Sequence, residues 1–92
     1  MKLLPQEIQD RLTTLTGWEF DGQMLVREWT FRNFREAMHF VKQVADLAEA
    51  MDHHPDIYIS YNRVRLSLMT HSEGGITDRD FQLAAQINRS GS

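Results

Sequence analysis

Cysteine is absent from the 92-residue sequence. Its absence excludes disulfides as restraints and thiolates as metal ligands or nucleophiles. Long apolar runs are also missing: the N-terminal one is too short for a signal peptide, and no later stretch could span a membrane, so we expect a cytoplasmic protein. The net charge is −3, with no basic stripe that could bind phosphates. This pattern argues against a nucleic-acid-binding module.

The composition that remains is that of an ordinary globular protein. Hydrophobic residues make up 41% and charged residues 25% of the chain. The length predicts a single domain over residues 1–92. Because a chain this short buries a modest share of its surface, association with further copies is the remaining common source of buried area.

The hydrophobic pattern alternates between helical and strand periodicity. It predicts an α+β fold in the order α-β-β-α-β-β-α: a four-stranded, mostly antiparallel sheet with three helices on one face. The expected elements are a helix from Pro5, strands over 18–20 and 24–31, a helix over 34–51, strands over 57–61 and 64–71, and a helix from Thr77.

The long helix carries two apolar stripes, whereas a surface helix on a sheet needs one. We expect the first stripe to face the sheet and the second to face outward, where a second copy of the chain would cover it. The first stripe consists of Phe34, Ala37, Met38, Val41, Ala45 and Ala48, and the second of Phe40, Val44, Leu47 and Met51.

Two turns are expected to set the hairpins. Asp21-Gly22 suits a two-residue hairpin turn, and Asn62-Arg63 can reverse the chain in the second hairpin. With that second turn His54 lies opposite His71, and a slip of one residue places His53 there instead. Either register brings imidazoles from two segments to one end of the sheet.

The sequence His53-His54-Pro55 together with His71 admits three interpretations. The histidines are ordinary surface or capping residues, or ligands of a zinc ion, or acid/base catalysts. Adjacent histidines in an extended segment point to opposite sides, which makes a shared metal awkward. Imidazole exchanges protons near neutral pH, which suits acid/base chemistry on an organic substrate.

Several segments together resemble the signature of the pterin-4a-carbinolamine dehydratases. The resemblance extends over nearly the whole chain and is specific as a set. Its segments are Gly17-Trp18-Glu19, Glu49-Ala50-Met51-Asp52-His53-His54-Pro55, Tyr61-Asn62-Arg63-Val64, Thr70-His71 and Gly75-Ile76-Thr77-Asp78-Arg79-Asp80.

The resemblance implies a hydro-lyase that converts 4a-hydroxytetrahydropterin to quinonoid dihydropterin without a metal or organic cofactor. Such enzymes regenerate the tetrahydropterin used by aromatic amino acid hydroxylases, and they form homodimers or homotetramers. By this likeness His53 and His71 donate protons to the leaving hydroxyl. His54 is also catalytic, since it holds the pterin ring and assists proton removal, and Asp80 and Arg79 belong to the rim of the site.

Some alternatives stay open. Asp80 follows Thr77 at the spacing of a helix capping box, which competes with a direct role in the site. Trp18 is a candidate for stacking on the pterin ring, but a core position is favoured for such a residue. The family resemblance also allows a non-enzymatic module that binds a transcription factor, or an enzyme acting on another pterin, as in molybdenum-cofactor metabolism.

Overall fold

The computed structural model describes residues 1–91 and confirms the α+β prediction. In chain order the elements are α1 (Pro5–Leu12), β1 (Glu19–Phe20), β2 (Leu25–Thr30), α2 (Phe34–Met51), β3 (Asp56–Ser60), β4 (Arg63–Leu68), the short 3-10 helix η1 (His71–Glu73) and α3 (Asp78–Gly91). The strands form one sheet in the order β1-β2-β4-β3, and every neighbouring pair is antiparallel.

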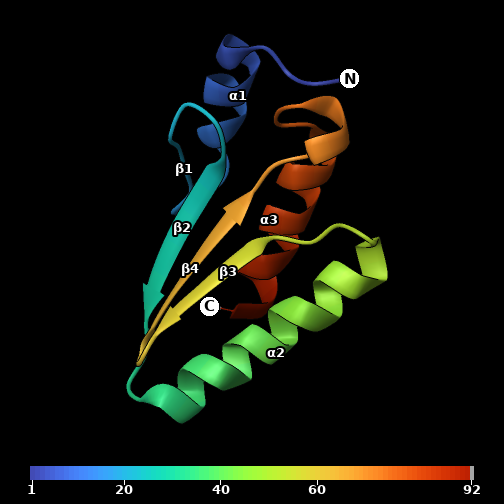
Figure 1. Ribbon diagram of the computed structural model, residues 1–92. Coiled ribbons are helices and arrows are strands. Elements are labelled where there is room, and N and C mark those ends of the chain that lie inside the picture. The colour runs from blue at the N-terminus through green and yellow to red at the C-terminus, as the bar shows by residue number, and fades with distance from the viewer. Residues whose placement is uncertain (92) are drawn as a thin grey trace.

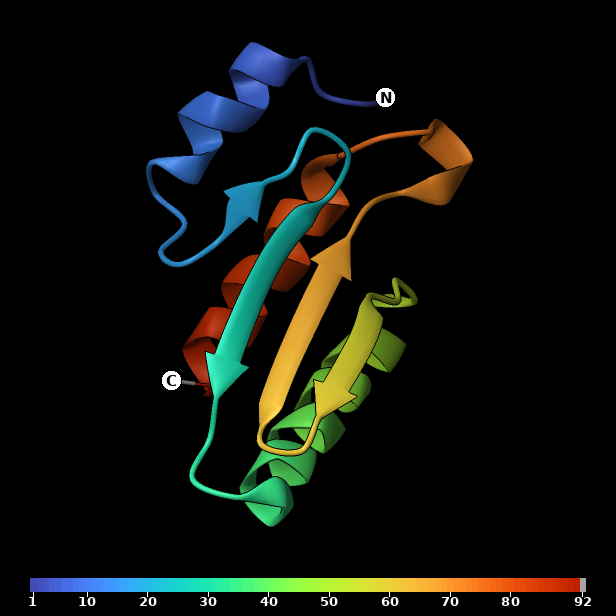
Figure 2. The ribbon, with the colours of Figure 1, turned by 60° about the vertical axis from the view of Figure 1, so that its left-hand side comes forward.

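The helices α2 and α3 lie against the same face of the sheet, as Figures 1 and 2 show. The core fills the space between them and the central strands. Strand β4 contributes the fully buried side chains Val64, Leu66 and Leu68, and α3 contributes Leu83 and Ile87. Alternation along β4 leaves Arg63 and Arg65 on the open face of the sheet. None of the helices described is long and apolar enough to cross a membrane.

The long helix spans the predicted residues, but its orientation differs from the prediction. Asn33 caps the helix by accepting a hydrogen bond from the backbone N–H of Glu36 at 2.9 Å. Phe40, predicted to face outward, is buried, and its ring packs against Trp29 and Phe31 with centroid distances of 4.7 and 5.1 Å. Packing these aromatic rings stabilises this orientation of α2 more than burial of the smaller side chains of the first stripe would.

The face of α2 that packs on the core therefore combines residues of both stripes. The buried residues of α2 are Ala37, Phe40, Val44 and Ala48. Leu47 and Met51 are partly buried against the core, so they are not the outward surface that was predicted. Phe34 and Met38, expected against the sheet, are 49% and 39% exposed.

Both hairpin turns are displaced from their predicted positions by one residue. In the first hairpin, Phe20 pairs with Leu25 and the backbone N–H of Asp21 bonds Met24 O, so the turn lies at Gly22-Gln23. In the second hairpin, Ser60 pairs with Arg63, so the turn residues are Tyr61 and Asn62. Tyr61 adopts a left-handed conformation with φ 52°.

The second turn is displaced because Asn62 is bonded to the end of β2. Its side-chain amide donates to Phe31 O at 2.9 Å, and its own carbonyl accepts from Phe31 N–H at 2.7 Å. This tertiary anchoring fixes the register of β3 against β4, in which Asp56 pairs with Ser67. Extending that register does not place His54 or His53 opposite His71, so the predicted pairing is wrong.

Asp21 closes the first hairpin by accepting backbone hydrogen bonds from Met24 and Gln23 at 2.7 and 2.9 Å. These bonds, that of Met24 first, lower the pKa of Asp21 from its ordinary value of 3.8. The folded protein therefore gains stability above pH 3.8, and this gain is lost as the pH falls through the lower folded-state pKa.

We expect Asp21→Ala to lower the free energy of unfolding at pH 7 by about 1 kcal/mol or less, because the site is exposed to water. The difference from the wild type should shrink as the pH falls below 3.8. Urea unfolding at several pH values measures both effects. Asp21→Asn, which keeps a neutral acceptor, is the matched control. A deficit that is independent of pH in Asp21→Ala would contradict the role of the charge.

Candidate functional site

The C-terminus of α2 positions the first histidine. Asp52 adopts a left-handed conformation with φ 51° and ψ 45°, a role usually taken by glycine. The following N–H, that of His53, bonds back to Ala48 O at 3.0 Å. This reversal ends the helix and turns His53 into the protein, where its side chain is 7% exposed.

His53 is paired with a buried carboxylate from another helix. Its Nε2 lies 2.5 Å from Oδ1 of Asp80, which is completely buried in the first turn of α3. The two residues are 27 positions apart, so only the packing of α2 against α3 brings them together. Asp80 is therefore fully buried, whereas the family resemblance implied a place at the rim of the site.

The second oxygen of Asp80 has two further partners. Oδ2 accepts the hydroxyl of Thr70 and the backbone N–H of Thr77, both at 2.9 Å. The bond to Thr77 N–H is the reach-back bond of a helix capping box. Capping was one of two alternatives for Asp80; the structure shows the capping bond, and the other oxygen of the same carboxylate contacts His53.

The other two histidines are exposed and flank this pair. His54 follows His53, and its Nε2 lies 2.5 Å from Oε2 of Glu49 on the last turn of α2. His71 opens the 3-10 helix directly after Thr70, whose hydroxyl bonds Asp80. His53 is thus bonded to Asp80, and His54 and His71 each directly follow a residue that is bonded to Asp80.

Sequence reasoning missed two contributors to this arrangement. Thr70 appeared only as part of the Thr70-His71 segment, although its hydroxyl is buried against Asp80. Glu49 appeared only as part of the segment from Glu49 to Pro55, although its carboxylate bonds His54. The spacing of Glu49 and His54 offers a signal only once the helix end between them is known.

Two residues predicted to bind substrate have structural partners. The guanidinium of Arg79 donates to the carbonyls of Met51 and Asp52 at 2.9 and 2.7 Å, which places a positive charge at the C-terminus of α2. Trp18 is 5% exposed, and its indole N–H donates to Asn88 on the last part of α3. Asn88 and Asp80 are eight residues apart on that helix, or about 12 Å.

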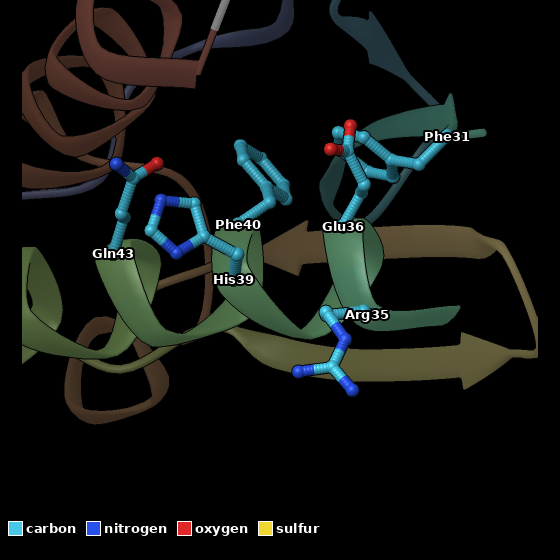
Figure 3. Close-up of a pocket in the computed structure, with 6 residues that line it drawn as sticks. All are labelled: Phe31, Arg35, Glu36, His39, Phe40 and Gln43. Atoms are coloured by element: carbon cyan, nitrogen blue, oxygen red, sulfur yellow. The ribbon is translucent and has the colours of Figure 1, made fainter. Parts of the chain in front are cut away.

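A polar cavity of about 240 Å³ is lined in part by Thr70 and Thr77, the hydrogen-bond partners of Asp80, and by Arg79. A second cavity, of about 340 Å³, lies along the first half of α2 and is shown in Figure 3. His39 is one of its lining residues, and Phe31 and Phe40 contribute aromatic side chains to the lining. His53, His54 and His71 line neither cavity. Within residues 1–91, no group of three or more histidine or acidic side chains is arranged to hold a metal ion.

Known proteins similar to this chain share its length. The family described as pterin 4 alpha carbinolamine dehydratase matches residues 1–90. A protein of Sulfolobus acidocaldarius named "Putative pterin-4-alpha-carbinolamine dehydratase" is 47% identical over 97% of this chain and 98% of its own. One of the same name from Thermomicrobium roseum is 56% identical over 87% of this chain and 86% of its own.

The fold has a solved counterpart. The crystal structure of a "transcriptional coactivator/pterin dehydratase" from Brucella melitensis matches with a TM-score of 0.91 and 38% identity, covering 97% of both chains.

The His53–Asp80 pair predicts an asymmetry between the adjacent histidines. Replacing His53 by alanine leaves a buried carboxylate oxygen without its partner, so the free energy of unfolding should fall by about 1–3 kcal/mol. His54→Ala removes an exposed contact and should change it by about 0.5 kcal/mol or less. Urea unfolding followed by circular dichroism tests this contrast. Equal losses would mean that the pair does not stabilise the fold.

Proposed function

Because this chain belongs to the pterin 4 alpha carbinolamine dehydratase family, we propose that it is a hydro-lyase that removes water from a 4a-hydroxytetrahydropterin. The observation that supports this proposal most is the pairing of His53 with a buried carboxylate, flanked by two solvent-accessible imidazoles. This arrangement holds one proton-transfer group in a fixed orientation and leaves two others open to a ligand.

The proposed reaction breaks the bond between C4a and its hydroxyl oxygen. The lone pair of the adjacent ring nitrogen forms the new C=N bond, and the departing oxygen takes a proton from an imidazolium. A base then removes a proton from the ring, which leaves quinonoid dihydropterin and water. General acid–base assistance of this kind typically contributes about 10²–10⁴-fold to the rate.

We assign the proton-donating roles to His53 and His71, and the contact with the pterin ring to His54. The exposure of His54 and His71 supports direct contact with a ligand. Asp80 is completely buried, so it acts through His53 rather than on the substrate. In the same way, Arg79 acts by holding the end of α2, and Trp18 by packing in the core.

A non-enzymatic binding module is the main alternative function. It is favoured by the description of the Brucella melitensis protein, which names it a coactivator as well as a dehydratase. A binding module has no need of a buried carboxylate aligned on an imidazole, whereas general acid–base catalysis does. A dehydratase for another pterin, such as one of molybdenum-cofactor metabolism, would use the same histidines and would differ in substrate preference.

Turnover of a chemically prepared 4a-hydroxytetrahydropterin, followed by absorbance, tests the proposed activity. His53→Ala and His71→Ala should each lower kcat by about 10²-fold or more. His39→Ala is the matched control, because this exposed histidine lies on α2 outside the cluster and should leave kcat unchanged. A wild-type protein without turnover would favour the binding module, and full activity in either active-site variant would remove that residue from the mechanism.

We also propose that the outer surface of α2 joins two copies of the chain. Phe34, Met38 and Ala45 are exposed and recur at helical spacing, and the first two are large apolar side chains. A soluble monomer rarely leaves such a strip uncovered, and packing the same strip from a second copy gives a two-fold contact. This strip replaces the one centred on Leu47 that the sequence suggested.

The corresponding prediction is that Met38→Glu shifts the protein toward monomer, because an unpaired carboxylate would be buried at the contact. Gln43→Glu, which adds the same charge five residues further along α2 and therefore on a different face of the helix, is the control. Analytical ultracentrifugation at high micromolar concentration measures the association. A wild-type monomer, or a Met38→Glu oligomer of unchanged size, would place the contact elsewhere or exclude it.

A further inference from the structure

The carboxylate of Asp80 accepts hydrogen bonds from three groups. Its Oδ2 accepts from the hydroxyl of Thr70 and the backbone N–H of Thr77, and its Oδ1 faces Nε2 of His53. A fully buried carboxylate requires such donors, because burial removes the water that would otherwise solvate its charge. An ionised carboxylate has no proton to donate, so each of these groups must direct a proton toward it.

The direction of the hydroxyl bonds follows from this requirement. Thr70 has a single hydroxyl proton, which it gives to Asp80. The bond of 2.7 Å between the hydroxyls of Thr70 and Thr77 must then be donated by Thr77. The hydroxyl oxygen of Thr77 accepts in turn from the backbone N–H of Arg79 at 3.3 Å. The chain of donors thus runs in one direction and ends on Asp80.

We infer that this chain fixes the tautomer of His53 and that Nδ1 is the atom of His53 that exchanges a proton with the substrate. A neutral imidazole has one ring proton, and the contact with Oδ1 requires it on Nε2. Nδ1 is then left with a lone pair that takes up a proton and gives it back.

Within this inference Thr70 is a positioning residue: it keeps Oδ2 occupied as an acceptor and so keeps Oδ1 aligned on His53. The assignment of Nδ1 as the reacting atom rests on the proposed dehydratase function. The tautomer of His53 can be observed without any substrate. A wrong tautomer assignment is therefore distinguishable from a wrong dehydratase assignment.

The side-chain nitrogens of His53 in the full-length protein report the tautomer through long-range ¹H–¹⁵N NMR correlations, recorded at a pH where the ring is neutral. We expect the Nε2–H form in the wild type. Thr70→Val keeps the shape of the side chain but removes the donor, and should populate both tautomers and lower kcat. Thr70→Ser restores the hydroxyl and should restore the Nε2–H form. Thr70→Val with wild-type tautomer and kcat would overturn the role of Thr70.

Asp80→Asn provides a sharper test. Thr70 and the backbone N–H of Thr77 both donate at the Oδ2 position, so the amide oxygen of the new asparagine must occupy it. The amide NH₂ then takes the Oδ1 position and faces His53. Nε2 of His53 must therefore accept a hydrogen bond from this NH₂. Neutral His53 should therefore switch to the Nδ1–H form, which has no lone pair at the proposed reacting atom. We expect kcat to fall by up to about 10⁴-fold, the loss that the same change causes in a serine protease triad.

The outcomes separate the two proposals. A tautomer that switches in Asp80→Asn while kcat is retained would overturn Nδ1 as the reacting atom and leave the dehydratase proposal standing. A wild type in the Nδ1–H form would overturn the proton arrangement itself. If Asp80→Asn does not fold, the comparison of Thr70→Val with Thr70→Ser decides the question on the same two readouts, the tautomer and kcat.

A wild type with the predicted tautomer but no turnover would refute the dehydratase function and, with it, the role of Nδ1.

Discussion

Complete burial of the Asp80 carboxylate is the constraint on which the arrangement of the site depends. An isolated charge in such a position would destabilise the fold by several kcal/mol, so its partners must come with it. They come from the end of α2, the end of the segment after β4, and the start of α3. The same bonds that satisfy the carboxylate therefore tie α3 to the two segments that carry His53, His54 and His71.

The parts of the fold that local chemistry determines could be predicted from the sequence. The helix over 34–51 begins at Asn33, whose side chain caps it, and the structure gives the same bounds. The order of helices and strands follows from the change of hydrophobic period along the chain. Both features depend on residues within a few positions of one another.

Features that depend on tertiary contacts were predicted less well. The side of α2 that faces the sheet is decided by Trp29 and Phe31, which lie on or next to a strand and meet Phe40 only in the folded protein. The turn at Tyr61 and Asn62 is set by bonds to Phe31, 31 positions away. In the site, the likeness to a family identified Asp80, but the depth of its burial and its bond to Thr70 required the packing of α3.

The short bridge between Thr70 and Gly75 separates the loop that carries His71 from the framework beneath it. Thr70 N–H donates to Gly75 O at 2.8 Å, and this bond closes the loop at its base. Thr70 lies on the framework side, where its hydroxyl meets Asp80, and His71 lies on the loop side. Insertions or deletions between Ser72 and Gly74 can therefore change the surroundings of His71 while the buried carboxylate and its donors stay in place. The loop is thus a segment in which relatives of this chain can differ around His71 without rebuilding the His53–Asp80 pair.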